Sequence, residues 1–195
     1  MRLSGIDISH HNKITNFNDY DFVIIKATEG VTYTDKNLEK NCQLAKNQNK
    51  LIGFYHFLSE KTEPEEQAKH FVEEVEKLDM IGKAILVLDF EDKALKKGSP
   101  FAKRFLDEVY NLTKVRAIIY MSASTVASMN WKKVAPYHGL WVASYGLNNG
   151  KFHTLNKTLR PWPTYAIYQF TSVPLDKDVA NMTKQAWLKY ANGDR

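Results

Sequence analysis

The sequence is poor in several features that would assign it to a familiar class of protein. It has one cysteine among 195 residues, which excludes an internal disulfide and a cysteine-rich metal site. No uninterrupted apolar stretch is long enough to span a bilayer, so we expect no stable membrane insertion. The segment Met1–Asp7 carries one cation and no long apolar core, so we expect no signal peptide and, if the protein is exported, another route.

The single Cys42 falls at helical spacing with Leu38 and Ala45. A thiol on the apolar face of a helix is usually a packing residue. We therefore expect a buried structural cysteine and not a nucleophile.

Basic charge is present but is not concentrated. The chain has 27 Lys and Arg against 22 Asp and Glu, a net charge of +5, which favours acidic partners such as nucleic acid or an anionic bacterial cell wall. The lysines are scattered, with short pairs at Lys96-Lys97 and Lys132-Lys133, and no basic run is interleaved with aromatic residues. The pattern therefore favours the cell wall and predicts no nucleic-acid partner.

The chain also lacks internal repeats, low-complexity tracts and any linker-like segment. An apolar content of 44% with 25% charged residues is ordinary for a globular protein. We expect a single domain over residues 1–195, acting as a monomer.

Strand and helix signals alternate along most of the sequence. Short apolar runs predict strands at residues 3–9, 22–30, 51–58, 84–92, 115–121, 139–145 and 165–170, with a last one around 174–176. Helical periodicity falls at residues 35–50, 68–78, 101–112, 124–130 and 179–190. This alternation predicts an α/β fold in which a parallel sheet closes into an irregular TIM-like barrel, with five strand–helix units followed by three strands with few helices.

One of these runs carries two acids at its end. Residues 84–88 are apolar and lead into Asp89, Phe90 and Glu91. Side chains alternate along a strand, so Asp89 and Glu91 should share a face, about 6.6 Å apart at the backbone, with Phe90 opposite. Two carboxylates held together at the end of an apolar strand cannot easily both be charged. The pKa of one of them should therefore rise, as in the acid pairs of glycoside hydrolases. The alternative is a pair of solvated loop acids.

The other strands also tend to end in a polar or aromatic residue. In a parallel barrel these ends meet at one rim, where active sites of such folds are built. The strand-end residues are Asp7, Glu29, His56, Tyr120, Tyr145, Gln169 and Asp176. Aromatic faces bind sugar rings, and we expect Tyr55, Tyr120, Trp141, Tyr145, Tyr168 and Trp162 to line or flank the rim.

A metal site is a competing interpretation. His10 and His11 follow Asp7, but adjacent histidines on an extended chain point in different directions, so an ion would also need His56 or an acid. We expect no metal and no cofactor. Glu29 is a candidate catalytic acid, and the alternative is that it bonds Lys26 or backbone groups beside the site. We expect it to contribute to substrate binding.

Six stretches together resemble family 25 of the glycoside hydrolases, the muramidases of phage and bacterial origin. They are residues 5–9 (GIDIS), 22–30 (FVIIKATEG), 53–57 (GFYHF), 86–91 (LVLDFE), 140–145 (LWVASY) and Tyr168-Gln169. The resemblance implies hydrolysis of the β-1,4 bond between N-acetylmuramic acid and N-acetylglucosamine in peptidoglycan. It implies that Glu91 is the general acid and that Asp89, Asp7 and Asp176 assist it.

The last family motif departs from its usual pattern, because Asp176-Lys177-Asp178 has Lys at an apolar position. Asp176 is preferred over Asp178 at this site. The predicted substrate-binding residues are Tyr55, His56, Tyr120, Trp141, Tyr145, Gln169 and Glu29. A metal-dependent polysaccharide deacetylase and a non-catalytic glycan-binding barrel remain as alternatives. The resemblance implies that residues 1–195 form a single catalytic barrel domain with no separate wall-binding domain. The site of action is expected to be the bacterial cell wall, outside the cell or after release from the cytoplasm by a holin.

Overall fold

Eight strands hydrogen-bond side by side in a closed ring. The computed structural model describes residues 2–194. The ring strands are β1 (Leu3–Ile8), β2 (Phe22–Glu29), β4 (Leu51–Phe57), β5 (Ile85–Asp89), β6 (Ile118–Ser122), β7 (Leu140–Ala143), β8 (Ile167–Thr171) and β9 (Lys177–Ala180). They follow the order β1-β9-β8-β7-β6-β5-β4-β2, and pairing of β1 with β2 closes the ring. A short strand, β3 (Tyr33–Thr34), is added antiparallel to β2.

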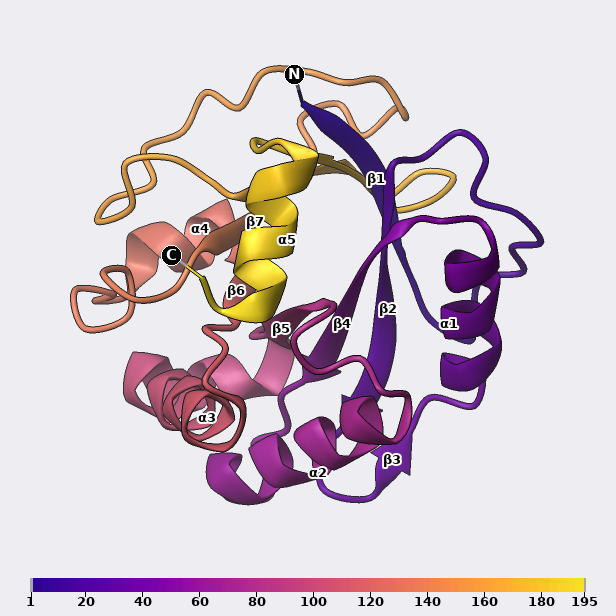
Figure 1. The fold of residues 1–195 in the computed structure, drawn as a ribbon. Helices are drawn as coiled ribbons and strands as arrows, with labels where there is room; N and C mark the ends of the chain where they lie inside the picture. Colours follow the sequence, from indigo (N-terminus) through magenta and orange to yellow (C-terminus); the bar gives the residue numbers. More distant parts are fainter. Residues whose placement is uncertain (1, 195) are drawn as a thin grey trace.

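Helices cover much of the outside of this ring (Figure 1). They are α1 (Leu38–Asn47), α2 (Pro64–Lys77), α3 (Gly98–Thr113), α4 (Ala123–Ser128) and α5 (Lys184–Asn192), with a 3-10 turn, η1 (Asp92–Lys97), before α3. The predicted α/β class and irregular TIM-like barrel are confirmed. One detail differs, because β1 is followed by irregular residues 9–21 and not by a helix.

The alternation of side chains along each strand divides the apolar core into two parts. Phe22, Ile24 and Val87 point into the ring, where they form an inner cluster. Their neighbours Val23 and Leu88 point outward and pack with the covering helices. Inner and outer positions alternate along most of each strand, with register shifts after Lys26 in β2 and after Gln169 in β8. The inward side chains at the strand ends therefore form the rim of the barrel.

One inner position has no side chain. Gly5 of β1 lies against the ring of Phe22, and a Cβ placed on Gly5 would come within 2.3 Å of that ring. Glycine at this position therefore allows the large Phe22 side chain to fill the barrel near the start of β2.

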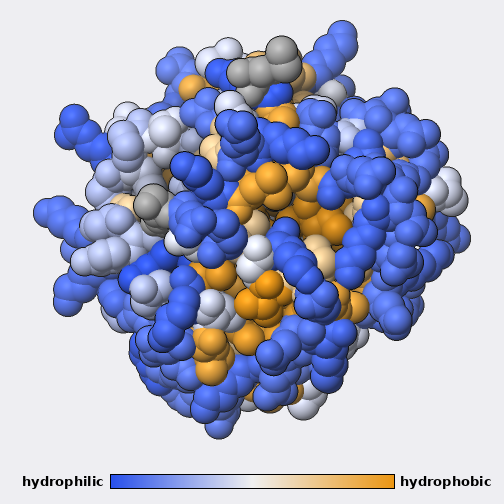
Figure 2. Space-filling model, viewed as in Figure 1, coloured by the Kyte–Doolittle hydropathy of each residue, from blue (hydrophilic) through white to orange (hydrophobic). Residues whose placement is uncertain are grey.

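Helix α5 covers the end of the barrel where β2 begins. Trp187 of α5 is fully buried, and its ring centroid lies 4.7 Å from that of Phe22. In Figure 1 α5 crosses in front of the strands, and Figure 2 shows apolar side chains gathered at the centre of this face within a hydrophilic surround. Helix α5 does not cover the opposite end of the barrel, where β2, β4 and β5 end, so a functional site can form there.

The last strand departs from the prediction. The strand expected at residues 174–176 instead occupies Lys177–Ala180, and the final helix begins at Lys184, not near residue 179. Strand β9 is antiparallel to both β1 and β8, so the ring is mixed and not wholly parallel. Because β9 runs the other way, its beginning lies at the rim where most other strands end.

Cys42 is buried on the inner face of α1 together with Leu38 and Ala45. Burial raises the pKa of its thiol. The expected structural role of this cysteine is confirmed.

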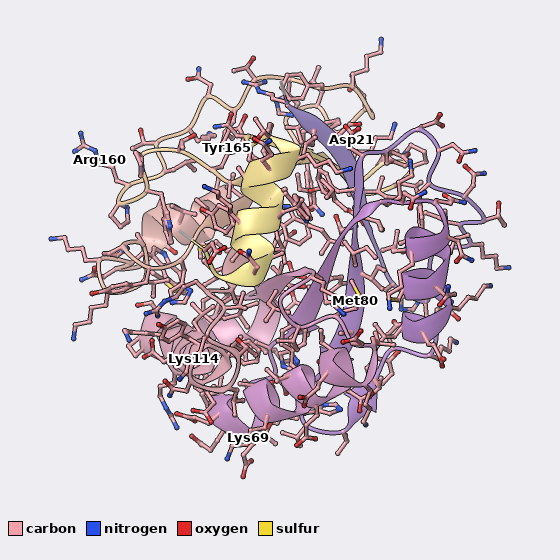
Figure 3. The ribbon with its side chains drawn as sticks, in the orientation of Figure 1. Asp21, Lys69, Met80, Lys114, Arg160 and Tyr165 are labelled. Atoms are coloured by element: carbon pink, nitrogen blue, oxygen red, sulfur yellow. The ribbon has the colours of Figure 1, made fainter. Side chains whose placement is uncertain are left out.

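Charged side chains point outward over the surface, as Lys69 on α2 and Arg160 illustrate in Figure 3. Within residues 2–194, every helix is too short or too polar to cross a bilayer.

Candidate active site

A cavity of about 190 Å³ opens at the rim of the barrel. We call it the acidic pocket. Its lining residues come from six strands and the segments that adjoin them: Asp7, Tyr55, Asp89, Glu91, Tyr120, Trp141, Tyr145, Gln169 and Asp176. The structure thus brings together the four acids that the sequence singled out, together with five of the seven residues predicted to bind substrate.

Asp89 and Glu91 reach the acidic pocket from the end of β5. Glu91 has extended backbone angles, φ −147° and ψ −171°, so the alternation of the strand continues past Asp89. Phe90 points the other way, where it is fully buried and meets Trp131 edge-on at 5.7 Å between ring centroids. The two acids therefore share a face as the strand period requires.

Gln169 of β8 connects three residues of the pocket. The hydroxyl groups of Tyr120 and Tyr145 donate to its Oε1 at 2.8 and 2.7 Å, which leaves its Nε2 to donate to Asp7 Oδ2 at 2.6 Å. Two donors on one oxygen fix which end of the amide faces Asp7. Gln169 and the two tyrosines therefore orient the Asp7 carboxyl group.

Asp178 lies directly behind the acidic pocket. It is 1% exposed, and Trp141 Nε1 donates to its Oδ1 at 2.8 Å. Its Oδ2 has no donor among the described residues, while its carboxyl group is within hydrogen-bonding reach of Asp7. A proton held on Asp178 and donated to Asp7 satisfies both groups, and burial raises the pKa of Asp178 well above its ordinary value.

Asp178 is the acid that the sequence analysis set aside. Its position two residues from Asp176 would have put both on one side of an extended segment. In the structure Asp176 lines the pocket and Asp178 supports Asp7 from beneath.

The pocket holds carboxyl groups that resist ionisation. Burial raises the pKa of Asp7 to about 8, the charge of Asp176 adds to this, and hydrogen bonds from Gln169 and Asp178 oppose it. Burial also raises the pKa of Asp89 well above its ordinary value, with Glu91 and Asp7 contributing. The cluster therefore retains protons that isolated carboxyl groups lose below neutral pH.

Glu91 is the more exposed of the β5 pair, since Asp89 is only 7% exposed. Burial raises the pKa of Glu91, and the charges of Asp92 and Asp176 raise it further. The ammonium group of Lys26 opposes these effects at both Asp89 and Glu91. A half-buried, proton-holding carboxyl group at an open pocket is suited to proton donation.

His56, which the sequence predicts to bind substrate, lies outside the acidic pocket. His56 alternates with Tyr55 on β4, so it points outward, where it is fully buried and stacks on Phe105 at 4.8 Å. Thr28 Oγ1 lies 2.8 Å from its Nδ1 and Gln67 Oε1 lies 3.0 Å from its Nε2. The Gln67 amide nitrogen already donates to Ser59 and Thr62, so its oxygen accepts from Nε2–H of His56.

Two of the six aromatic residues expected at the rim lie elsewhere. Tyr168 occupies an outward position on β8, where it is fully buried and its hydroxyl donates to the Ser144 carbonyl at 2.8 Å. Trp162 is 5% exposed, and its Nε1 donates to the His138 carbonyl at 2.7 Å. Tyr55, Tyr120, Trp141 and Tyr145 do line the acidic pocket.

Glu29 lies outside the acidic pocket. Its carboxylate accepts from Lys26 Nζ at 2.8 Å, and both residues line an adjoining cavity. Its expected contact with substrate stays a prediction.

His10 and His11 are adjacent, but the third histidine considered for a metal site, His56, lies elsewhere. His10 Nδ1 lies 2.8 Å from Asp35 Oδ2, and the His10 and His11 rings are 3.8 Å apart, while His56 is buried on another side of the sheet. Within residues 2–194, no three or more His, Cys, Asp and Glu side chains are grouped so that they could hold a metal ion. The deacetylase alternative is therefore not favoured.

Comparison with known proteins identifies the family. Residues 6–179 match the family described as glycosyl hydrolases family 25, which is most of the chain. The chain belongs to glycosyl hydrolases family 25. An autolytic lysozyme of Clostridium acetobutylicum is 28% identical over 152 residues, which cover 75% of this chain and 46% of that protein. A lysozyme of Streptococcus phage Cp-7 is 26% identical over 168 residues, which cover 80% of this chain and 45% of that protein.

Solved structures of family 25 have the same fold. A family GH25 lysozyme from Aspergillus fumigatus matches with a TM-score of 0.82 at 25% identity, covering 99% of this chain and 100% of that one. The catalytic domain of endolysin ply40 from bacteriophage P40 of Listeria monocytogenes matches with a TM-score of 0.78 at 27% identity, covering 99% and 98%. The chain spans about half the length of the curated relatives it matches, at 46% and 45%.

Proposed function

We propose that this protein is a lysozyme that hydrolyses the β-1,4 bond between N-acetylmuramic acid and N-acetylglucosamine in peptidoglycan. The observation that carries the proposal is the grouping of Glu91 with Asp7, Asp89 and Asp176 around one open pocket in a family 25 barrel. Glycoside hydrolysis needs one carboxyl group that is protonated and another that is ionised, and a crowded, half-buried cluster provides both.

Glu91 is the general acid in this mechanism. It donates its proton to the glycosidic oxygen as the bond from that oxygen to the anomeric carbon breaks. A water molecule then adds at the anomeric carbon, and the Glu91 carboxylate takes up the proton that this water releases. The half-exposed position of Glu91 supports this role, because its proton must reach substrate.

The acid cluster cannot hold all of its protons at once, and its ionised member stabilises the positive charge that develops at the anomeric carbon. Asp89 is held beside Glu91 on β5, and Asp7 is held by Gln169 and Asp178. Preorganised charges of this kind act strongly in a buried site because they need not reorient during the reaction.

The sugar chain is the proposed partner, and the aromatic side chains Tyr55, Trp141 and Tyr145 flank its path. A monomeric state is part of the proposal. Action at the bacterial cell wall, without nucleic acid or membrane partners, remains part of the proposal.

Fragments released from purified peptidoglycan test the function. We expect new reducing ends, with muramic acid at the reducing terminus by mass spectrometry. Glucosamine at that terminus, or acetate without new reducing ends, would overturn the proposal.

A further inference from the structure

A second and larger cavity adjoins the acidic pocket. Its volume is about 590 Å³, compared with about 190 Å³ for the acidic pocket, so it can hold a group of the size of a sugar or a short peptide. The ring of Phe57 lies in its lining together with side chains from the end of β2, the segment after β4 and the turn η1. We call it the lysine cavity.

The lysine cavity belongs to the same rim as the catalytic acids. Phe57 follows Tyr55 of the acidic pocket on the same face of β4, and it is paired in register with Asp89 of β5. Asp92 of the lysine cavity is the next residue after Glu91. A glycan bound at Glu91 would therefore present its neighbouring groups to this cavity.

The charges of the two cavities differ. The lining of the acidic pocket contains four carboxyl groups and neither Lys nor Arg. The lysine cavity is lined by Lys26, Lys61, Lys93 and Lys96, with Glu29, Glu60 and Asp92. A substituent with negative charge is repelled by the first lining and is attracted to the lysines of the second.

The four lysines are of two kinds. Lys26 is already paired within the protein. Its Nζ donates to Glu29 at 2.8 Å and lies 4.9 Å from the centre of the Phe57 ring, and its side chain is 14% exposed. Lys61, Lys93 and Lys96 are exposed, and their ammonium groups make no ion pair or hydrogen bond among the described residues. Lys77, Lys83 and Lys103, on the helices and near them, each pair with an acid close in sequence.

We propose that the lysine cavity binds an anionic group, carboxylate or phosphate, on a substituent of the glycan strand. In peptidoglycan a carboxylate is supplied by the peptide stem, and a phosphate by a polymer linked to the sugar. Lys61, Lys93 and Lys96 meet the anion, and Lys26 with Glu29 and Phe57 forms the rigid side of the cavity beside Glu91. This inference rests on the proposed lysozyme function and adds a preference for charged, substituted glycan.

The test compares two triple variants on matched substrates. Lys61, Lys93 and Lys96 are changed to Gln in one protein. Lys69, Lys184 and Lys189 are changed to Gln in the control, which loses the same net charge from α2 and α5; Lys69 points outward in Figure 3. The substrates are peptidoglycan with both substituents, the same wall after enzymatic removal of the stems, the wall after removal of phosphate polymers, and an uncharged oligomer. The uncharged oligomer alternates N-acetylmuramic acid and N-acetylglucosamine, and its lactyl carboxyl groups are converted to amides. The rate of formation of reducing ends gives kcat and KM.

We expect the cavity variant to raise KM on the fully substituted wall roughly tenfold with kcat nearly unchanged, since three exposed ion pairs are each weak. The control should stay within about twofold of wild type, and the two variants should be alike on the uncharged oligomer. If removing stems abolishes the difference, the anion is carboxylate; if removing phosphate polymers abolishes it, the anion is phosphate.

Equal losses in the two variants would overturn the proposal that the lysine cavity binds an anion, because the loss of net charge alone would explain them. A loss of the same size on the uncharged oligomer, or no loss on any substrate, would also overturn it while the lysozyme function stands. A wild-type protein that releases no reducing ends from any of these substrates would reject the lysozyme function, and the cavity proposal with it.

Discussion

Gln169 donates its side-chain amide to Asp7 at 2.6 Å, although 162 positions separate the two residues in the sequence. The closed ring of strands is what joins them, because β9 lies between β1 and β8 and brings both to the same rim. Tyr120 and Tyr145 donate to the other end of the amide, so the orientation of Asp7 depends on three residues, from β8, from β6 and from the segment after β7.

Changing Gln169 to Leu should therefore impair catalysis without unfolding the barrel. A hydrogen bond to a charged group contributes about 1.5–3 kcal/mol, so kcat should fall roughly 10- to 150-fold. Loss of the bond also removes an effect that lowers the pKa of Asp7, so the pH–rate profile should move to higher pH. Rates of reducing-end formation from pH 4 to 9 check both points, with Gln185→Leu on the exposed side of α5 as the control. Wild-type rates and an unshifted profile would show that Gln169 does not position Asp7.

Glu91→Gln should abolish most turnover and leave substrate binding intact. Removal of a general acid costs on the order of 10²–10⁴-fold in rate, and Gln keeps the size of the side chain but has no proton to donate. Binding to purified walls, measured by co-sedimentation, and reducing-end release are the two measurements. Glu73→Gln, on the exposed face of α2, is the control and should behave as wild type. Near-normal wall lysis by the Glu91 variant would remove this residue from the mechanism.

Asp178→Asn should stabilise the protein at alkaline pH. The folded pKa of Asp178 lies above the unfolded value, so the folded chain holds a proton that the unfolded chain loses once the pH rises above about 4. Stability from this group is therefore present at acid pH and is lost as the pH rises toward the folded pKa. Asn can still donate to Asp7 and accept from Trp141, so it keeps both contacts without the ionisation.

The measurement is the thermal midpoint at pH 4, 6 and 8, where each 1 kcal/mol corresponds to about 2–4 °C for a chain of this size. The variant should gain on wild type as the pH rises, whereas exposed Asp19→Asn should run parallel to wild type. Parallel curves for Asp178→Asn would contradict a protonated Asp178.

His56→Leu should reduce stability and not the chemistry. The change leaves the buried Thr28 hydroxyl unpaired, which costs about 1–3 kcal/mol. Gln67 Oε1 loses one of its two donors but keeps the Ser59 N–H, and the acidic pocket is untouched. We expect a lower thermal midpoint but normal kcat per folded molecule at 20 °C. A loss of kcat in fully folded protein would restore His56 to the site.

The same variant has a pH signature opposite to that of Asp178. Burial lowers the pKa of His56 to about 3, so the unfolded chain takes up a proton below about pH 6.5 that the folded chain refuses. Wild type should lose this contribution to stability as the pH falls from 6.5 toward 3. His56→Leu should lack that loss, so the difference between the two midpoints should shrink in acid.

Much of the fold could be read in advance because strand periodicity is local. Apolar runs located the eight ring strands except the last, whose residues 177–180 alternate with two charges and follow a proline. The same period of two could have excluded His56, since it is adjacent to Tyr55 and the two must face opposite sides of β4. Trp162 and Tyr168 were placed at the rim because aromatic residues serve the core and sugar binding equally well, and composition does not separate these uses.

The sequence by itself determined the chemistry of the site, because the types of residue at strand ends and their alternation are written in the chain: Asp89 and Glu91 on one face, Phe90 on the other. Only the tertiary structure decided which distant groups meet them. Closure of the ring, with β9 reversed, set Asp178 against Asp7 and the lysine cavity beside Glu91, and contacts of this kind depend on packing between strands that no local pattern encodes.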